Sequence, residues 1–127
     1  MTINAYAALE PAKPLEAFQY DEGARGAFDA DIAITHCGVC HSDLHLADGD
    51  WGVDGRFPMV PGHEIIGTVT AVGDAADPDL VGKRVGIGWQ RGSCLSCEWC
   101  VSGNENLCDS SVATCVGNYG GFAERVV

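Results

Sequence analysis

The chain has 127 residues and a mass of 13.3 kDa, which is enough for one domain with a single core and too little for two. Its formal net charge of −11 disfavours nucleic acid and anionic membranes as partners, since both repel a negative surface. The sequence has no apolar run long enough for a membrane helix, and Met1–Lys13 lacks the pattern of an export signal, so we expect a soluble, cytoplasmic protein.

The first half of the chain predicts two strands and a helix. Apolar residues alternate over Ile3–Leu9 and again over Asp31–Thr35, as they do in half-buried strands. Ser42 is a good helix N-cap and begins a stretch without proline or glycine, which predicts a short helix up to about Gly49. We expect no other helix.

The second half predicts strands separated by loops. Glycine and proline place a loop over Asp50–Gly62, and β-branched residues place strands over Ile65–Val72 and Arg84–Trp89. Gly92–Cys115 shows no periodicity, and Phe122–Val127 is strand-like. The sequence therefore predicts a mainly β fold, a small and partly open antiparallel barrel with a cysteine-rich loop as an excursion from it.

Four of the seven cysteines lie within one short loop, at Cys94, Cys97, Cys100 and Cys108. In a chain without an export signal such a cluster indicates metal binding. Four thiolates suit a closed, tetrahedral zinc site that stabilises the loop and leaves no position for substrate. An iron–sulfur cluster, redox chemistry or disulfides are the alternatives.

A second set of metal-ligand types comes from residues 37–45 and 61–64. Cys40 and His63 offer a thiol and an imidazole, and a catalytic zinc needs three protein ligands and one open position. The alternative is structural, with His63 capping a turn and Cys40 acting as a small buried hydrophobic residue.

Three motifs in this order resemble the zinc-dependent medium-chain alcohol dehydrogenases, and the version at 37–45 is similar to the cinnamyl-alcohol-dehydrogenase-like and yeast-type branches. They are Cys40–His45, Gly62–Glu64 and the four-cysteine loop. The resemblance implies that residues 1–127 form the GroES-like catalytic domain, with a structural zinc loop at 92–115. It also implies a catalytic zinc, NAD or NADP, a small alcohol or aldehyde substrate, and homo-oligomers in intact members.

The resemblance also implies roles around the catalytic zinc. Cys40 would be its thiolate ligand and His63 its imidazole ligand, while Glu64 would lie beside the metal and reach it when another ligand leaves. Asp43 would accept a hydrogen bond from the far ring nitrogen of His63 and so fix its tautomer. A solvated charge at the helix start is the alternative for Asp43.

Further roles follow from the same resemblance. Ser42 would bind the alcohol oxygen, His45 would pass its proton to solvent through the cofactor ribose, and His41 would face the cofactor pyrophosphate. Trp51 and Trp89 resemble walls of the substrate pocket. The alternatives are a helix cap for Ser42, an exposed helix histidine for His45, and ordinary core packing for the two tryptophans.

The sequence also departs from the family pattern. The family's third zinc ligand is a cysteine further along than Val127, while Cys37 lies too near Cys40, and Cys115 too near the loop, to be its equivalent. No Gly-x-Gly-x-x-Gly motif of a Rossmann domain is present. We therefore expect an alcohol dehydrogenase domain with an incomplete catalytic ligand set, inactive by itself. A zinc-binding GroES-like module without turnover is the alternative, and a GroES-like folding module is the weakest hypothesis.

Overall fold

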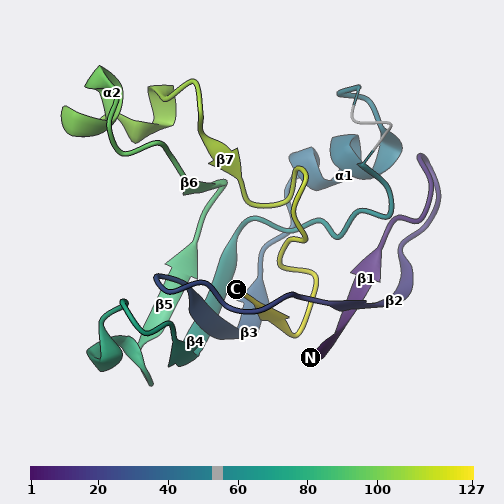
Figure 1. The fold of residues 1–127 in the computed structure, drawn as a ribbon. Helices are drawn as coiled ribbons and strands as arrows, with labels where there is room; N and C mark the ends of the chain where they lie inside the picture. Colours follow the sequence, from purple (N-terminus) through teal and green to yellow (C-terminus); the bar gives the residue numbers. More distant parts are fainter. Residues whose placement is uncertain (53–55) are drawn as a thin grey trace.

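The computed structural model describes residues 1–52 and 56–127. Figure 1 shows α1 and α2 at the same end of the strands. The strands are β1 (Thr2–Ala7), β2 (Glu16–Asp21), β3 (Ala30–Cys37), β4 (Ile65–Val72), β5 (Arg84–Ile87), β6 (Gln90–Gly92), β7 (Val112–Ala113) and β8 (Arg125–Val126). The helices are α1 (His41–Asp48) and α2 (Glu98–Val101), with 3-10 turns η2 (Pro78–Leu80) and η3 (Glu105–Leu107). None of these described helices is long and apolar enough to cross a membrane.

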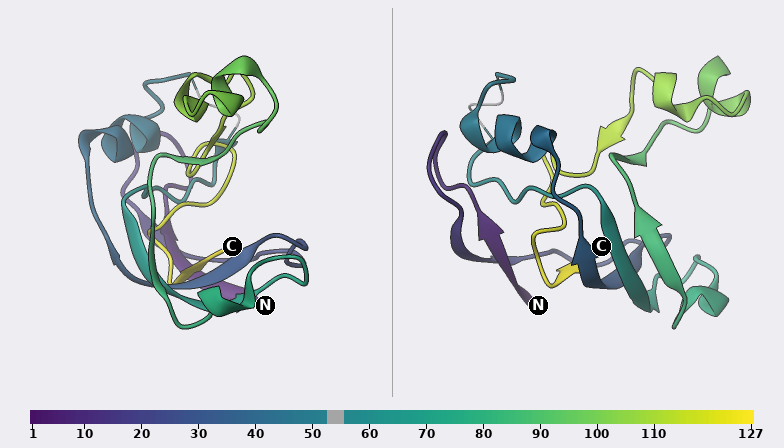
Figure 2. Two further views of the ribbon diagram at one scale, coloured as in Figure 1. Left: turned by 90° about the vertical axis from the view of Figure 1, so that its left-hand side faces the viewer. Right: turned by 180° about the vertical axis from the view of Figure 1, so that it is seen from behind.

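The strands form antiparallel sheets in the orders β5-β4-β3-β8, β1-β2 and β6-β7. The first two sheets are joined by the residues before β8. There the Tyr6 N–H donates to the Phe122 carbonyl at 2.8 Å, and the Glu124 N–H donates to the Asn4 carbonyl at 3.0 Å. Figure 2 shows the resulting curvature, with β1 beside the end of the chain. The mainly β, antiparallel fold expected from the sequence is confirmed.

Buried side chains form three clusters that follow from the strand and helix patterns. In β1 every second residue is buried, because successive side chains of a strand point to opposite faces. One cluster lies on β1 and β2, and another lies within β3, β4 and β8. The third consists of Leu46, Met59 and Cys115. It packs α1 against the loop before β4 and the loop after β7. The buried face of α1 therefore determines where its polar face lies.

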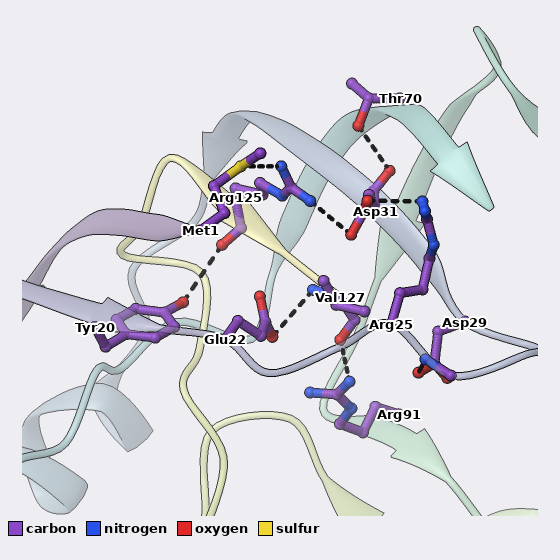
Figure 3. A network of polar contacts seen from close by, with 11 residues as sticks. Met1, Tyr20, Glu22, Arg25, Asp29, Asp31, Thr70, Arg91, Arg125 and Val127 are labelled. Carbon is purple, nitrogen blue, oxygen red and sulfur yellow. Dashed lines mark hydrogen bonds and ion pairs between the residues drawn. The ribbon is translucent and has the colours of Figure 1, made fainter. Parts of the chain in front are cut away.

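A buried carboxylate, Asp31, links three segments at the opposite end of the sheets. It is 6% exposed, and it lies 2.8 Å from the Arg25 guanidinium and 2.7 Å from the Arg125 guanidinium. Figure 3 shows the two guanidinium groups meeting Asp31 from different sides. Thr70 of β4 donates its hydroxyl to the Asp31 carbonyl at 3.3 Å. This network joins β3, β4 and β8 through side chains as well as backbone.

Several predicted elements need correction. The helix α2 lies in the cysteine-rich loop, where no helix was expected, since one turn is too short to produce a hydrophobic period. The strand β2 was not predicted, because it is exposed along most of its length. The short strands β6 and β7 lie partly in the segment without periodicity. Of the predicted strand at the C-terminal end, only Arg125–Val126 forms β8. Residues 53–55 of the predicted loop lie outside the described residues.

Candidate metal centres and active site

The four clustered cysteines converge as their spacing predicts. Their sulfur atoms all lie within 4.8 Å of one another, with Cys97 Sγ 3.5 Å and Cys94 Sγ 3.9 Å from Cys100 Sγ. Tetrahedral zinc with Zn–S bonds of 2.3 Å requires sulfur atoms about 3.8 Å apart. All seven cysteines of the chain are free thiols. The four sulfur atoms therefore fit a closed tetrahedral metal site, and the cluster is consistent with a structural zinc loop.

Local backbone geometry turns this loop around the sulfur atoms. Leu95 adopts a positive φ of 57°, and the Cys97 N–H then donates to Cys94 Sγ at 3.3 Å. The Cys94 N–H in turn donates to Cys108 Sγ at 3.5 Å. Hydrogen bonds from Ser96 and then Cys97 lower the pKa of Cys94 to about 6. These donors favour the thiolate, which is the form that binds a metal.

A second centre lies where α1 begins and where the loop before β4 passes it. Cys40, and not Ser42 as predicted, is the N-cap of α1, because its side chain accepts the Ser42 N–H. Its Sγ lies 3.2 Å from Nε2 of His63. A thiolate and an imidazole bound to one tetrahedral zinc would be about 3.5 Å apart. Gly62, with φ of +100°, makes the turn that presents His63, and a Cβ there would lie within 3 Å of Gly121 N. The donor pair fits a zinc ion.

Asp43 is the polar group that organises this centre. It is 3% exposed, and its Oδ1 lies 3.3 Å from Nδ1 of His63 and accepts the Gly62 N–H at 2.8 Å. Its Oδ2 accepts the Cys40 N–H at 3.0 Å. One carboxylate thus faces both candidate ligands, which excludes the alternative of a solvated helix-start charge. With Nδ1 of His63 beside Asp43, the other ring nitrogen, Nε2, points toward Cys40.

The neighbouring acids and thiols occupy different sides of His63. Ligand atoms of Cys40, His63 and Glu64 lie within 4.8 Å of one another, and so do those of Asp43, His63 and Cys115. Cys115 is fully buried, and its Sγ lies 3.8 Å from Nδ1, the ring nitrogen opposite Cys40. Burial raises the pKa of Cys115 to about 12. Nε2 of His63 faces Cys40, whereas Nδ1 faces Asp43 and Cys115. Sequence reasoning missed the contact with Cys115.

Three residues of α1 point away from the core near this centre. The Ser42 N–H donates to Cys40 Sγ at 3.4 Å, and the rings of His41 and His45 stack with centroids 4.7 Å apart. His45 Nδ1 lies 2.7 Å from Oδ2 of Asp50, a partner that the sequence did not indicate. The hydroxyl and the two imidazoles thus come from α1 itself, and the Asp50 carboxylate comes from just beyond its C-terminal end.

Trp51 and Trp89 continue this row of rings to His63. Trp51 stacks on His45 with centroids 5.8 Å apart, and Trp89 meets the Trp51 ring edge-on at 6.1 Å and the His63 ring edge-on at 5.0 Å. They are 48% and 43% exposed, so the alternative that they are ordinary core residues is wrong. The Thr114 N–H donates to the Trp89 carbonyl at 2.8 Å and holds this wall in place.

Comparisons with known proteins agree with this geometry. A family model described as the alcohol dehydrogenase GroES-like domain matches residues 26–127. The aldehyde reductase AdhA of Synechocystis sp. is 49% identical over 124 residues, and cinnamyl alcohol dehydrogenase 2 of Rauvolfia serpentina is 37% identical over 129 residues. These matches cover 98% and 96% of this chain, but 37% and 36% of the relatives.

Solved structures give the same result. A cinnamyl alcohol dehydrogenase from Sorghum bicolor superposes with a TM-score of 0.91 at 33% identity, covering 99% of this chain and 38% of that one. The cinnamyl alcohol dehydrogenase of Helicobacter pylori, solved with NADP(H), gives 0.91 at 30% identity, with coverage of 99% and 39%. The chain spans a little over a third of the length of these relatives. It belongs to the family of alcohol dehydrogenase GroES-like domains, in the cinnamyl-alcohol-dehydrogenase-like branch of the zinc-dependent medium-chain alcohol dehydrogenases.

Proposed function

We propose that residues 1–127 are the metal-binding catalytic domain of an NAD(P)-linked oxidoreductase that interconverts a small alcohol with its aldehyde or ketone. The relatives named above act on alcohols or aldehydes by their printed names, and one was solved with NADP(H). The observation that carries the proposal is the thiol–imidazole pair of Cys40 and His63, 3.2 Å apart, with buried Asp43 behind the ring.

The structural zinc belongs to the loop at 92–115. Its four sulfur atoms occupy every position of a tetrahedron, so the loop offers no place for substrate. Its role is to hold α2, η3 and the intervening turns together, because a loop with few buried apolar side chains gains folding free energy from the metal.

The catalytic zinc would be held by Cys40 and His63, with Glu64 within reach as a further ligand. When bound, the zinc supplies Lewis acidity that lowers the pKa of an alcohol, and NAD(P) supplies the hydride acceptor. Asp43 would orient the His63 ring and strengthen the imidazole as a ligand, because its Oδ1 lies 3.3 Å from Nδ1 and would attract the proton to that nitrogen.

Proton transfer would follow the exposed side of α1. Ser42 would accept and pass on the substrate hydroxyl proton, and His45, one helical turn further on, would carry it toward solvent. Asp50 holds His45 by its Nδ1 and so leaves Nε2 as the proton-accepting nitrogen. His41 would meet the cofactor pyrophosphate, supplying a donor where the rest of the chain is strongly acidic.

Trp51 and Trp89 would form a wall of the substrate site. Both rings are half-exposed, and Trp89 meets His63 edge-on. Such a wall excludes water from the metal side and presents flat apolar surface to a substrate. In the chain joined to a dinucleotide-binding segment, Trp89→Ala should therefore raise KM for an apolar alcohol more than it lowers kcat. Trp99→Ala, which changes an exposed tryptophan in the zinc loop, should change neither.

Metal analysis on the chain tests the proposed ligand pair directly. After mild chelation and reloading in excess zinc, we expect one tightly held zinc ion per chain at the four cysteines and a second, weakly held zinc ion that is lost in Cys40→Ala or His63→Ala. Asp43→Asn should weaken zinc at this centre by about 10- to 100-fold without affecting the four-cysteine site. Unchanged zinc content in all three variants would refute the ligand assignment.

The second candidate is a zinc-binding GroES-like module without turnover. It is supported by the metal-ligand groups of this chain together with the lack of a Gly-x-Gly-x-x-Gly motif among its 127 residues. The two functions differ in whether turnover appears when a dinucleotide-binding segment is provided. Both predict the same metal content.

A further inference from the structure

We propose that His41 and His45 form an additional, peripheral binding site for an imidazole-seeking divalent cation such as Ni²⁺ or Cu²⁺. The site lies on the solvent side of α1 and is separate from the two centres already described. Nothing in the proposed dehydrogenase function requires a metal there.

The helix supplies the spacing. Residues four apart lie on one face of a helix, one turn above the other, and two histidines in this relation can bind a single ion. The His41 and His45 rings do lie together, with centroids 4.7 Å apart and planes 11° from parallel. Two imidazole nitrogens on one tetrahedral ion are about 3.3 Å apart. In this stacked arrangement the two lone pairs do not converge, so binding of one ion requires the exposed His41 ring to turn about its side-chain bonds until a nitrogen faces His45.

His45 is already arranged as a metal ligand. Its Nδ1 lies 2.7 Å from Oδ2 of Asp50, and a carboxylate on one ring nitrogen leaves the lone pair on the other. Trp51 stacks on the His45 ring at 5.8 Å and restricts its rotation. The His45 ring is therefore held in place by Asp50 and Trp51, while the His41 ring is exposed and free to turn.

The ligand chemistry selects the class of cation. Two neutral imidazoles, with water completing the coordination, favour borderline transition metals over Mg²⁺ or Ca²⁺, which prefer oxygen ligands. The acidic side chains of Asp48 and Asp50 at the end of α1, and the net charge of −11, attract cations to this face. If His41 and His45 also meet the dinucleotide, as the proposed function holds, the cation and the dinucleotide exclude each other.

A calorimetric titration of Ni²⁺ into the zinc-saturated, gel-filtered 127-residue chain tests the site. We expect one additional ion per chain in the wild type and none in His41→Gln or His45→Gln. Asp50→Asn should weaken binding by about tenfold or more. His36→Gln is the matched control, since His36 is an exposed histidine on β3 and should bind Ni²⁺ no differently from the wild type.

Cys40→Ala separates this proposal from the proposed catalytic centre. The additional Ni²⁺ should persist in Cys40→Ala even though the zinc bound with His63 is lost. In wild-type chain, paramagnetic Ni²⁺ should also broaden the imidazole NMR signals of His41 and His45 before that of His36, which checks the site without a variant. Binding that survives both His41→Gln and His45→Gln, or that disappears only in Cys40→Ala, would overturn it.

Discussion

Asp31 is a buried charge whose partners come from two different segments, Arg25 and Arg125. Removing one partner of a buried ion pair costs about 3–5 kcal/mol, and the partial exposure of both arginines reduces this. We predict that Asp31→Asn lowers the free energy of unfolding by about 2–3 kcal/mol, measured by urea denaturation. Asp21→Asn is the control, because Asp21 is exposed and its ion pair contributes less than about 1 kcal/mol. Equal losses in the two variants would contradict a special role for Asp31.

Glu22 and Glu124 should have opposite effects on the pH dependence of stability. Burial raises the pKa of Glu22, so the folded chain holds its proton more tightly than the unfolded chain does. The stability from that proton is present at low pH and is lost as the pH rises through the window above the ordinary glutamate pKa. Hydrogen bonds from Asn4 lower the pKa of Glu124, so its contribution is present at neutral pH and is lost on acidification.

We therefore predict that Glu22→Gln raises the Tm at pH 7 and that Glu124→Gln lowers it. The Glu22→Gln difference should shrink as the pH falls toward the ordinary glutamate pKa, whereas the Glu124→Gln difference should shrink only as the pH falls further, through the lowered pKa of Glu124. Differential scanning calorimetry of the two variants from pH 3 to 8, in each case against the wild type, gives the comparison. Shifts of the same sign at pH 7 would show that one of these two environments is misassigned.

At the scale of elements, the four-cysteine loop should behave as one metal-dependent unit. Cys94→Ser and Cys108→Ser should each lose the tightly held zinc and thermal stability together, because binding by four thiolates contributes folding free energy. The measurements are metal content and thermal unfolding. Cys37→Ser is the matched control, since Cys37 lies at the end of β3 and outside both candidate metal groups. Zinc retained in both loop variants would exclude this site.

How far the sequence predicts each element depends on where its order comes from. The β-branched run Ile65–Val72 was predicted with its observed bounds, because a half-buried strand has a pattern of its own. By contrast, β2 has a single buried side chain, Tyr20, and depends on pairing with β1. The one-turn helix α2 lies inside a loop ordered around sulfur atoms. Neither β2 nor α2 has a periodic apolar pattern of its own, so the sequence pattern did not predict them.

The same distinction holds for the candidate site. The resemblance to zinc-dependent alcohol dehydrogenases predicted that Cys40 and His63 meet, and their Sγ and Nε2 atoms lie 3.2 Å apart. The contact of His63 with Cys115, 52 positions away in sequence, depends on how the loop after β7 packs under α1. The row of rings from His45 to Trp89 likewise depends on tertiary structure. No local pattern encodes such contacts.

For residues 1–127 taken together, the proposed catalysis needs more metal ligands and more cofactor contacts than these residues provide. The metal-facing side of His63 offers Cys40 and Glu64, while NAD(P) requires a phosphate-binding turn that this sequence lacks. The net charge of −11 repels a dinucleotide, and His41 is a weak substitute for a helix N-terminus at the pyrophosphate. Calorimetry on the chain alone should therefore detect no micromolar binding of NAD(P).

The 127-residue chain by itself should show no measurable NAD(P)-dependent oxidation of alcohols, since two strong ligands and one carboxylate hold zinc poorly and nothing excludes water from the site. Activity should appear when the dinucleotide-binding segment of a relative, such as the Helicobacter pylori protein solved with NADP(H), is joined to the chain or added in trans. It should then be lost in Cys40→Ala and His63→Ala but kept in Cys37→Ser. Turnover by the chain alone, or activity that survives both ligand substitutions, would show that the chemistry is assigned to the wrong residues.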